Sequence, residues 1–268
     1  MAVVAMAGRY PGARTPDALW ALLREGRSAI GEVPSGRWDH AAHYDPAAER
    51  DDKSHTRFGG FVEDIDCFDA PLFHISPAEA RAIDPMERQF IEVLWELLEN
   101  AGHTPERLKQ GARNALGGDV GVFVGVMSQT YEQLATELWA KGSYTGAFSS
   151  HSSIANRASF LFDFTGPSLA VDTACSSSLS AVHMACEALR RGDCRAAVAG
   201  GANLLMHPLH HILLSAYRVL SPDALTRPSA PAERASWWAR ALARCCFGRW
   251  PMRCATAIRC WPSCVAPR

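Results

Sequence analysis

Short apolar runs alternate along this chain with segments whose apolar residues recur at helical spacing. Residues 2–7, 120–126, 168–172 and 196–200 are continuous, β-branched or small-residue runs. Such runs are typical of strands that are buried on both faces of a parallel sheet. We therefore expect four buried strands, each followed by a helix-forming segment.

Polar caps and apolar periodicity predict the helices between these strands. Thr15-Pro16-Asp17 and Ser76-Pro77-Ala78-Glu79 each place a hydroxyl residue before a proline, which favours a helix start. Alternating strands and helices indicate layered α/β architecture. The predicted helices cover residues 16–24, 85–100, 151–162, 176–191 and 208–219.

Two regions lack this regular pattern. Residues 31–60 are polar and rich in glycine and proline, so we expect loops and short hairpins over the surface. Residues 224–268 hold five of the nine cysteines, four of the eight tryptophans and eight arginines, but one acidic residue and no lysine. No apolar period is sustained there. We predict one unit over residues 1–223 and an unrelated tail over 224–268, out of frame or disordered.

Bulk properties exclude several classes of function. Of the 268 residues, 48% are hydrophobic and 21% are charged, and the net charge is −1. This balance gives no support to a nucleic-acid or anionic-membrane surface. No apolar run approaches the roughly 20 residues that span a bilayer. Nine cysteines, an odd number without extracellular signals, favour free thiols in a reducing, cytoplasmic compartment.

Candidate chemistry centres on Cys175. The strand at 168–172 runs directly into this cysteine, and the predicted helix at 176–191 follows it. A thiol at a helix N-terminus is next to unpaired N–H groups and the positive end of the helix dipole, which favour the thiolate. A thiolate is the form that attacks carbonyl carbons. The competing interpretation is a buried structural cysteine.

The segment around Cys175 resembles the active-site segment of the β-ketoacyl synthases, and in particular the ketosynthase domain of modular type I polyketide synthases. The resemblance covers residues 2–223, about the N-terminal half of such a domain. Its motifs are Asp172-Thr173-Ala174-Cys175-Ser176-Ser177-Ser178-Leu179, Ser153-Ile154-Ala155-Asn156-Arg157, Phe162-Asp163-Phe164-Thr165-Gly166-Pro167, Ala199-Gly200-Gly201-Ala202-Asn203, Leu220-Ser221-Pro222-Asp223, Gly8-Arg9-Tyr10-Pro11-Gly12 and Asp84-Pro85-Met86-Glu87-Arg88.

This resemblance implies the N-terminal half of a thiolase-like, layered αβαβα fold, in which two similar halves sandwich a helical layer. It implies that Cys175 takes an acyl chain from the phosphopantetheine thiol of an acyl carrier protein, and that the Cys175 backbone N–H helps to form an oxyanion hole. Decarboxylative condensation with a malonyl-type thioester would follow. The resemblance also implies a homodimer, and neither a bound cofactor nor a metal.

Other polar residues offer weaker alternatives. The family's two histidine motifs, resembling His-Gly-Thr-Gly-Thr and Asn-Ile-Gly-His, do not occur here. His183 is about 12 Å along the helix from Cys175, so we expect a packed helix histidine. The tail cysteines lack paired C-x-x-C spacing, which argues against zinc. We expect surface or capping roles for the remaining histidines after Cys175, which are His207, His210 and His211.

Three hypotheses follow from the sequence. The first is a condensing enzyme whose chain is truncated and unable to complete the condensation, because the histidine motifs are missing. The second is a non-catalytic acyl-binding or scaffold subunit that pairs with a full ketosynthase. The third is a non-functional gene fragment. Retention of Cys175 favours the first over the second.

Overall fold

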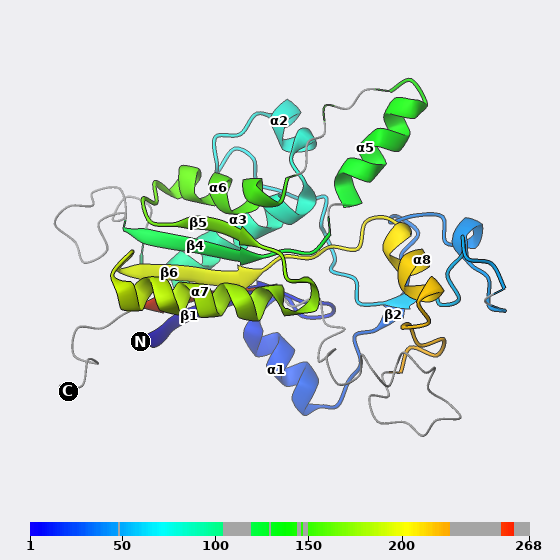
Figure 1. Ribbon diagram of the computed structural model, residues 1–268, viewed down its shortest axis with the longest axis horizontal. Helices are drawn as coiled ribbons and strands as arrows, with labels where there is room; N and C mark the ends of the chain where they lie inside the picture. The colour runs from blue at the N-terminus through cyan, green and yellow to red at the C-terminus, as the bar shows by residue number, and fades with distance from the viewer. Residues whose placement is uncertain are drawn as a thin grey trace.

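The predicted strands and helices form a layered α/β unit in the computed structural model (Figure 1). It describes residues 1–47, 49–103, 119–128, 130–143, 146 and 150–225, together with the backbone of residues 253–259. The strands are β1 (Ala2–Arg9), β2 (Gly31–Glu32), β3 (Phe58–Gly59), β4 (Val120–Gly125), β5 (Ser168–Val171), β6 (Ala196–Gly201) and β7 (Arg253–Arg259). The helices are α1 (Pro16–Arg24), α2 (Pro77–Ala82), α3 (Pro85–Asn100), α5 (Thr130–Ala140), α6 (His151–Phe162), α7 (Ser177–Arg191) and α8 (Leu209–Ala216), with short 3-10 turns η1 (Ala41–His43) and η3 (Ala174–Ser176).

Five strands form the main sheet in the order β1-β7-β6-β4-β5. β4 pairs in parallel with both β5 and β6, as expected for buried strands joined by helices. β2 and β3 form the separate short hairpin that the glycine-rich region predicts.

β7 differs from the expectation for the tail. Arg253–Arg259 pairs antiparallel with β1 on one side and with β6 on the other, so the first and third strands of the sheet are joined through it. For these seven residues the expectation of disorder is wrong. The remaining residues of the predicted tail beyond residue 225 lie outside the described ranges. The out-of-frame interpretation stays a prediction.

Side-chain alternation along β4 places a core on each face of the sheet. Val122 and Val124 face the layer formed by α3 and α6, whereas Phe123 packs under α7 with Ala181 and Ala185. The α7 face of the core is built from alanines, so this helix approaches the sheet closely. Figure 1 shows α7 on the opposite side of the sheet from α3 and α6, and α5 standing away from the sheet.

Helix starts agree with the sequence. The Thr15 hydroxyl accepts a hydrogen bond from the Ala18 N–H at 3.1 Å, and the Ser76 hydroxyl accepts one from the Glu79 N–H at 3.2 Å. α5 is a helix that the sequence analysis did not predict. Within the described ranges, no helix combines the length and the hydropathy that a membrane crossing needs.

Candidate active site

A strained turn carries Cys175 from β5 to α7. β5 ends at Val171, and the chain turns at Asp172. The 3-10 turn η3 then begins at Ala174 and leads directly into α7. Ala174 has a φ of 54°, in the left-handed region that residues with a Cβ rarely occupy. The Asp172 Oδ1 accepts a hydrogen bond from the Ala174 N–H at 2.9 Å, which holds the turn. Cys175 therefore precedes the first turn of α7, as the sequence predicts.

Hydroxyl side chains stabilise this turn. The Ser177 Oγ accepts a hydrogen bond from the Thr173 N–H at 2.9 Å and donates to the Ala174 carbonyl at 2.7 Å. The Ser176 Oγ donates to the Thr173 carbonyl at 2.8 Å. The small hydroxyl residues around Cys175 thus bind the backbone of the loop, because the turn leaves backbone groups that the strand and the helix do not pair.

The start of α7 rests directly on the end of β4. A Cβ on Gly125 would lie 2.4 Å from the Ser178 nitrogen and 2.5 Å from the Ser177 carbonyl carbon, closer than real Cβ contacts. Only glycine at this position lets the two backbones meet. The position of Cys175 is therefore set by a backbone contact as well as by its own loop.

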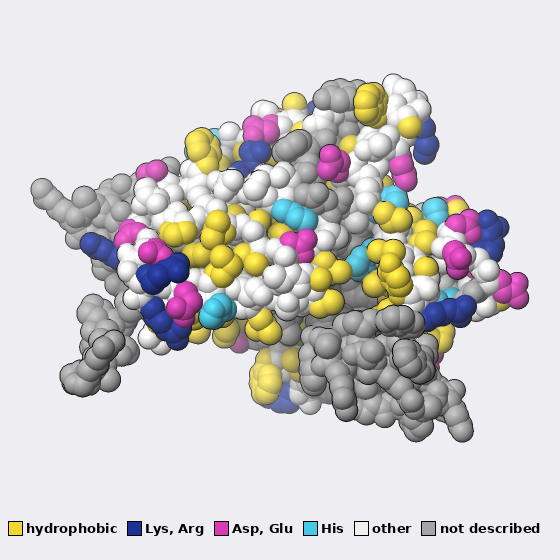
Figure 2. All heavy atoms as spheres, in the orientation of Figure 1, with side chains coloured by type: hydrophobic (Ala, Val, Ile, Leu, Met, Phe, Trp, Pro, Cys, Tyr) yellow, Lys and Arg dark blue, Asp and Glu magenta, His cyan; other side chains and the backbone are white. Residues whose placement is uncertain are grey.

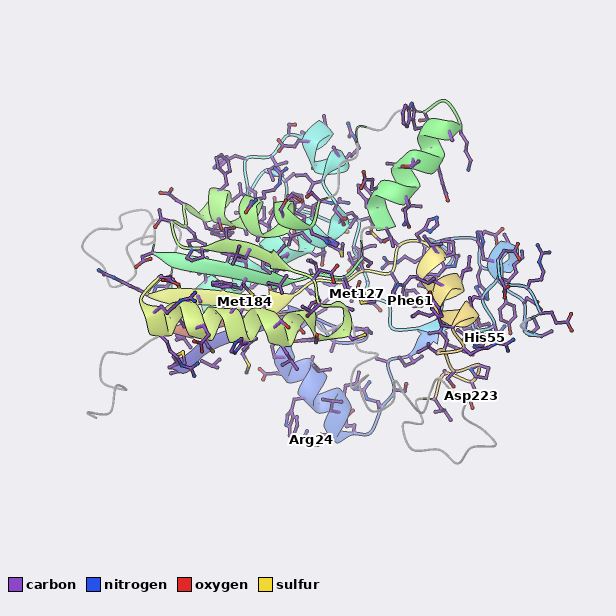
Figure 3. All side chains as sticks on the ribbon, in the orientation of Figure 1. Arg24, His55, Phe61, Met127, Met184 and Asp223 are labelled. Carbon is purple, nitrogen blue, oxygen red and sulfur yellow. The ribbon has the colours of Figure 1, made fainter. Side chains whose placement is uncertain are left out.

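Cys175 is exposed and lines a cavity of about 260 Å³. The cavity lies between the ends of β4 and β6, the start of α7, α8 and the β3 region. Figure 3 places Met127, which lines the cavity, between the sheet and Phe61, and shows Met184 on α7 away from it. An exposed thiol at the wall of a mostly apolar cavity can react with an acyl group that enters it.

The other described cysteines have different surroundings. Cys194 is 2% exposed, and burial raises the pKa of its thiol. Cys186 is half-buried and Cys67 is exposed. Cys194 lies in the loop between α7 and β6 and packs against Phe123 and Ala197.

Three of the histidine predictions are wrong. His183 is exposed on α7, not packed. His211 is 5% exposed, and its ring packs against Trp38 and Phe61 while its Nε2 lies 3.2 Å from the Phe58 carbonyl. A helix pattern alone could not show this, because residues 31–60 fold over α8 from far away in the sequence.

His207 is buried and His210 is half-buried. The His207 Nδ1 accepts a hydrogen bond from the Leu209 N–H at 3.1 Å, which matches the predicted capping role, and its Nε2 is 2.8 Å from the Glu137 Oε1 on α5. His210 lines the Cys175 cavity. Burial lowers the pKa of His210, so its ring is neutral at neutral pH. The expectation of a surface role does not hold for His210.

The described residues hold no group of three or more side chains that could ligate a metal ion. The tail cysteines, for which we predicted no zinc site, have side chains outside the described set.

Fold and site together define a layered α/β protein with an exposed thiol where a strand meets a helix. The family model described as "Beta-ketoacyl synthase, N-terminal domain" matches residues 1–243, past the boundary predicted at residue 223. The chain therefore belongs to the β-ketoacyl synthase family, with a thiolase-like fold.

Similar proteins are modular polyketide synthases. The chain is 45% identical over 221 residues to "Polyketide synthase PksL" of Bacillus subtilis, covering 82% of the chain and 5% of that protein. It is 45% identical over 222 residues to "Polyketide synthase ThaG" of Burkholderia thailandensis, covering 82% of the chain and 4% of that protein.

The similar solved structures are also ketosynthases. The oxazolomycin ketosynthase domain OzmH KS7 of Streptomyces albus matches with a TM-score of 0.79 at 42% identity, covering 87% of this chain and 39% of that one. The ketosynthase from module 6 of the bacillaene synthase of Bacillus subtilis matches with a TM-score of 0.78 at 29% identity, covering 98% of this chain and 40% of that one. The chain thus spans well under half of a ketosynthase domain.

Proposed function

We propose that this chain is the acyl-accepting part of a polyketide ketosynthase, with Cys175 as the nucleophile. The observation that carries this proposal is the exposed Cys175 thiol at the start of α7, on the wall of the 260 Å³ cavity. Family membership supplies the reaction class, which is that of a condensing transferase. The donor is an acyl thioester on the phosphopantetheine of an acyl carrier protein.

The acyl transfer balances as a thioester exchange. The Cys175 Sγ attacks the thioester carbonyl carbon and forms a new C–S bond, and the bond to the carrier sulfur breaks. The thiol proton of Cys175 ends on the released carrier thiol. The backbone N–H of Cys175, at the start of the 3-10 turn and α7, stabilises the oxyanion of the tetrahedral intermediate.

Condensation also needs groups that stabilise the negative charge of the decarboxylation step. The charge that develops while a malonyl-type thioester loses CO₂ requires hydrogen-bond donors close to the thioester carbonyl. The sequence contains neither of the two histidine motifs that the family resemblance implies. We therefore expect acylation of Cys175 without formation of a β-ketoacyl product.

The edge of the sheet supports a homodimer. β5 is an edge strand, and the exposed apolar side chains near it include Leu169 and, 82% exposed, Phe160. Figure 2 shows hydrophobic side chains gathered on the surface of the molecule in the region where Figure 1 draws β5. An exposed apolar edge strand is a template for pairing with another chain. Two copies would pair β5 with β5.

The first prediction concerns acyl transfer. Incubated with N-acetylcysteamine thioesters, the chain should gain one acyl group on Cys175, and Cys175→Ala should gain none. Peptide mapping by mass spectrometry checks the site. Cys67→Ala is the matched control because Cys67 is also an exposed thiol but lies outside the cavity. It should leave acylation unchanged.

Condensation is measured in the same reaction after malonyl carrier protein is added. Product from the 268-residue chain above the Cys175→Ala background would contradict the expectation of an incomplete site. Reversible acyl binding without a covalent adduct would favour the acyl-binding or scaffold alternative. Neither adduct nor binding would favour a non-functional fragment.

A further inference from the structure

A histidine at the start of α6 faces the turn that carries Cys175. The His151 Nδ1 lies 4.0 Å from the Asp172 Oδ2. The other oxygen of the same carboxylate, the Asp172 Oδ1, accepts the hydrogen bond from the Ala174 N–H that holds the turn. Cys175 directly follows Ala174 in the chain. His151 is therefore linked to Cys175 through one carboxylate and one backbone N–H.

The second ring nitrogen of His151 has no hydrogen-bond partner among the described residues. Its Nε2 is buried and neither donates nor accepts a hydrogen bond there. A neutral imidazole carries its proton on one of the two nitrogens, and the carboxylate beside Nδ1 favours the proton on Nδ1. The Nε2 lone pair is then buried without a partner, which costs free energy. Stability alone therefore does not explain a histidine at this position.

Helix α6 is anchored so that His151 stays beside Asp172. In its first turn the Ser153 Oγ donates a hydrogen bond to the Glu87 Oε2 of α3 at 2.5 Å, and Arg157 forms an ion pair with the same carboxylate, which is almost fully buried. Toward the end of α6 the Ser159 Oγ donates to the Ser168 Oγ of β5 at 2.9 Å. The helix is thus held by both α3 and β5.

The contact between His151 and Asp172 is one small side-chain movement away from a hydrogen bond. An N–H···O hydrogen bond spans about 2.7–3.2 Å, so the two atoms are about 1 Å too far apart. The Asp172 side chain is 47% exposed, which leaves it room for this movement. Once Oδ2 accepts the His151 N–H and Oδ1 accepts the Ala174 N–H, the carboxylate is held at both oxygens and no longer turns freely.

The turn needs such a hold because its backbone is strained. Ala174 has a left-handed φ of 54°, a conformation that persists only where the surrounding contacts enforce it. If Asp172 turned away, Ala174 could relax toward a right-handed conformation. The Cys175 Sγ and its backbone N–H would then shift relative to the start of α7.

We propose that His151 is a positioning residue for Cys175. Its Nδ1–H holds the Asp172 carboxylate, which in turn holds the strained Ala174 turn in the geometry that acyl transfer requires. His151 does not line the Cys175 cavity, so it acts through Asp172 and not by contact with the acyl group. This proposal rests on the acyl transfer to Cys175 proposed above.

The first test measures alkylation of Cys175 by iodoacetamide near neutral pH, with the labelled peptide quantified by mass spectrometry. His151→Phe keeps a ring but removes both nitrogens, and it should slow alkylation about 2- to 12-fold, the range that corresponds to one hydrogen bond. His151→Asn keeps an N–H donor close to the position of Nδ1 and should restore part of the rate. His183→Phe, at an exposed histidine of α7 outside the Cys175 cavity, is the matched control and should react as wild type.

Urea unfolding distinguishes positioning from a merely structural role. His151→Phe should unfold at the wild-type urea concentration or above it, because it removes a buried nitrogen without a partner. A lower midpoint, together with an alkylation rate that His151→Asn fails to restore, would overturn the proposal. A wild-type alkylation rate in folded His151→Phe would overturn it as well.

A double-mutant cycle tests the route through Asp172. In an Asp172→Ala background, His151→Phe should cause no further loss of the Cys175 alkylation rate. The same fold-loss in both backgrounds would show that His151 acts by another route, which overturns the proposal. If Asp172→Ala does not fold, the comparison of His151→Phe with His151→Asn decides.

Acylation by the N-acetylcysteamine thioester of hexanoic acid separates this proposal from the acyl transfer itself. In His151→Phe the limiting rate constant should fall while the half-saturating thioester concentration stays the same. If the wild-type chain is not acylated, the acyl transfer fails, and the alkylation rates still decide the role of His151. Equal limiting rate constants in wild type and His151→Phe would overturn the role of His151 alone.

Discussion

At the scale of single residues, the position of Cys175 depends on a glycine at the end of the neighbouring strand. Gly125 ends β4, and the backbone of Ser177 and Ser178 lies against it. We predict that Gly125→Ala destabilises the fold by about 1–3 kcal/mol, the usual cost of overpacking. It should also slow alkylation of Cys175, because the start of α7 must move away from β4. Urea unfolding and iodoacetamide kinetics measure the two effects.

Gly36→Ala is the control for this substitution. A Cβ at Gly36 meets nothing within 4 Å, and its φ lies outside the left-handed region. Its stability and its Cys175 alkylation rate should stay close to wild type. If Gly125→Ala behaved like Gly36→Ala, the contact between β4 and α7 would not position the thiol.

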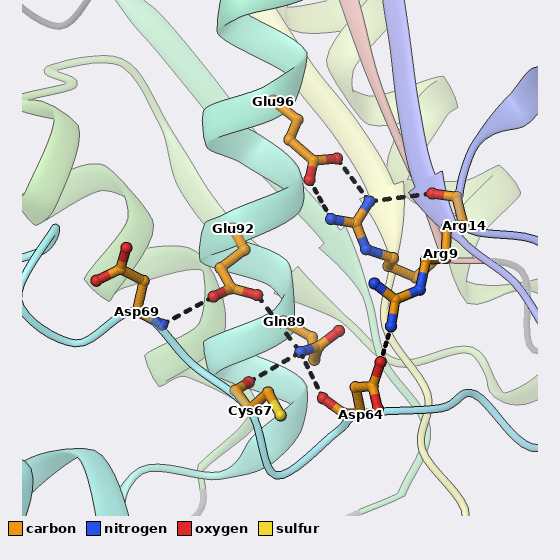
Figure 4. A network of polar contacts seen from close by, with 8 residues as sticks. All are labelled: Arg9, Arg14, Asp64, Cys67, Asp69, Gln89, Glu92 and Glu96. Carbon is orange, nitrogen blue, oxygen red and sulfur yellow. Dashed lines mark hydrogen bonds and ion pairs between the residues drawn. The ribbon is translucent and has the colours of Figure 1, made fainter.

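At the scale of elements, α3 is joined to the rest of the molecule through carboxylates (Figure 4). The Arg9 guanidinium on β1 forms a bidentate ion pair with Glu96 on α3. One turn earlier, the Glu92 Oε1 accepts a hydrogen bond from the Asp69 N–H at 3.0 Å. Burial raises the pKa of Glu92 above its usual value, an effect that the Asp69 N–H only partly offsets. Ionised Glu92 is therefore a cost to the folded state.

We predict that Glu92→Gln is as stable as wild type at pH 7 or more stable. The free energy of unfolding should rise by up to about 1 kcal/mol. Because the folded pKa is raised, wild-type Glu92 takes up a proton in the fold before it does so in the unfolded chain. The penalty of its charge thus disappears as the pH falls through the folded pKa. The advantage of the glutamine should shrink between pH 7 and pH 4. Urea midpoints over this range provide the measurement.

Glu63→Gln, at an exposed loop carboxylate, serves as the comparison. It should show little stability change at any pH. A Glu92→Gln variant that is clearly less stable at pH 7 would mean that the ionised carboxylate and the Asp69 N–H form a net stabilising pair, against the direction argued here.

Elements with local signals were predictable from the sequence. The caps at Thr15 and Ser76 and the continuous apolar run of β4 depend on neighbours within a few residues, so the pattern predicts them. The position of Cys175 before α7 was predictable for the same reason. α5 was missed, although its apolar residues Tyr131, Leu134 and Leu138 recur at helical spacing.

The wall of the cavity could not be predicted in the same way. His210 and His211 are adjacent in sequence and look equivalent. Both line the cavity, yet His211 is buried against Trp38 whereas His210 is half-buried. The difference comes from residues 31–60, which fold onto α8 from the other end of the chain. The left-handed φ of Ala174 was not predicted either, because alanine has no preference for it and the turn is held by the side chains of Asp172 and Ser177.

At the scale of the whole molecule, α7 has one buried face and one exposed face. Leu179 is 75% exposed in its first turn, and exposed apolar side chains also include Val3 and Met6 on β1. The solved ketosynthase domains are more than twice as long as this chain, as the coverage of 39% shows. These surfaces are therefore available for a partner, either a second copy or a completing half.

The position of β7 gives a whole-molecule prediction. Its amides should exchange with D₂O slowly, as those of β6 do, because β7 is paired on both sides. Hydrogen-exchange mass spectrometry measures both strands in one experiment. Fast exchange over Arg253–Arg259, with early proteolytic cleavage at those arginines, would restore the expectation of a loosely attached tail.

β7 also affects the order in which the strands of the sheet pair during folding. β4, β5, β6 and α7 follow one another closely in sequence and can assemble while later residues are still being synthesised. β1 and its sheet neighbour β7 lie far apart in the sequence, and β7 follows β4, β5 and β6. Pairing β1 with β7 therefore closes a long loop before the sheet is complete, a slow and entropically costly step. Until then the edges of β1 and β6 stay unpaired, and crowding of nascent chains at that stage promotes aggregation more than any instability of the finished fold.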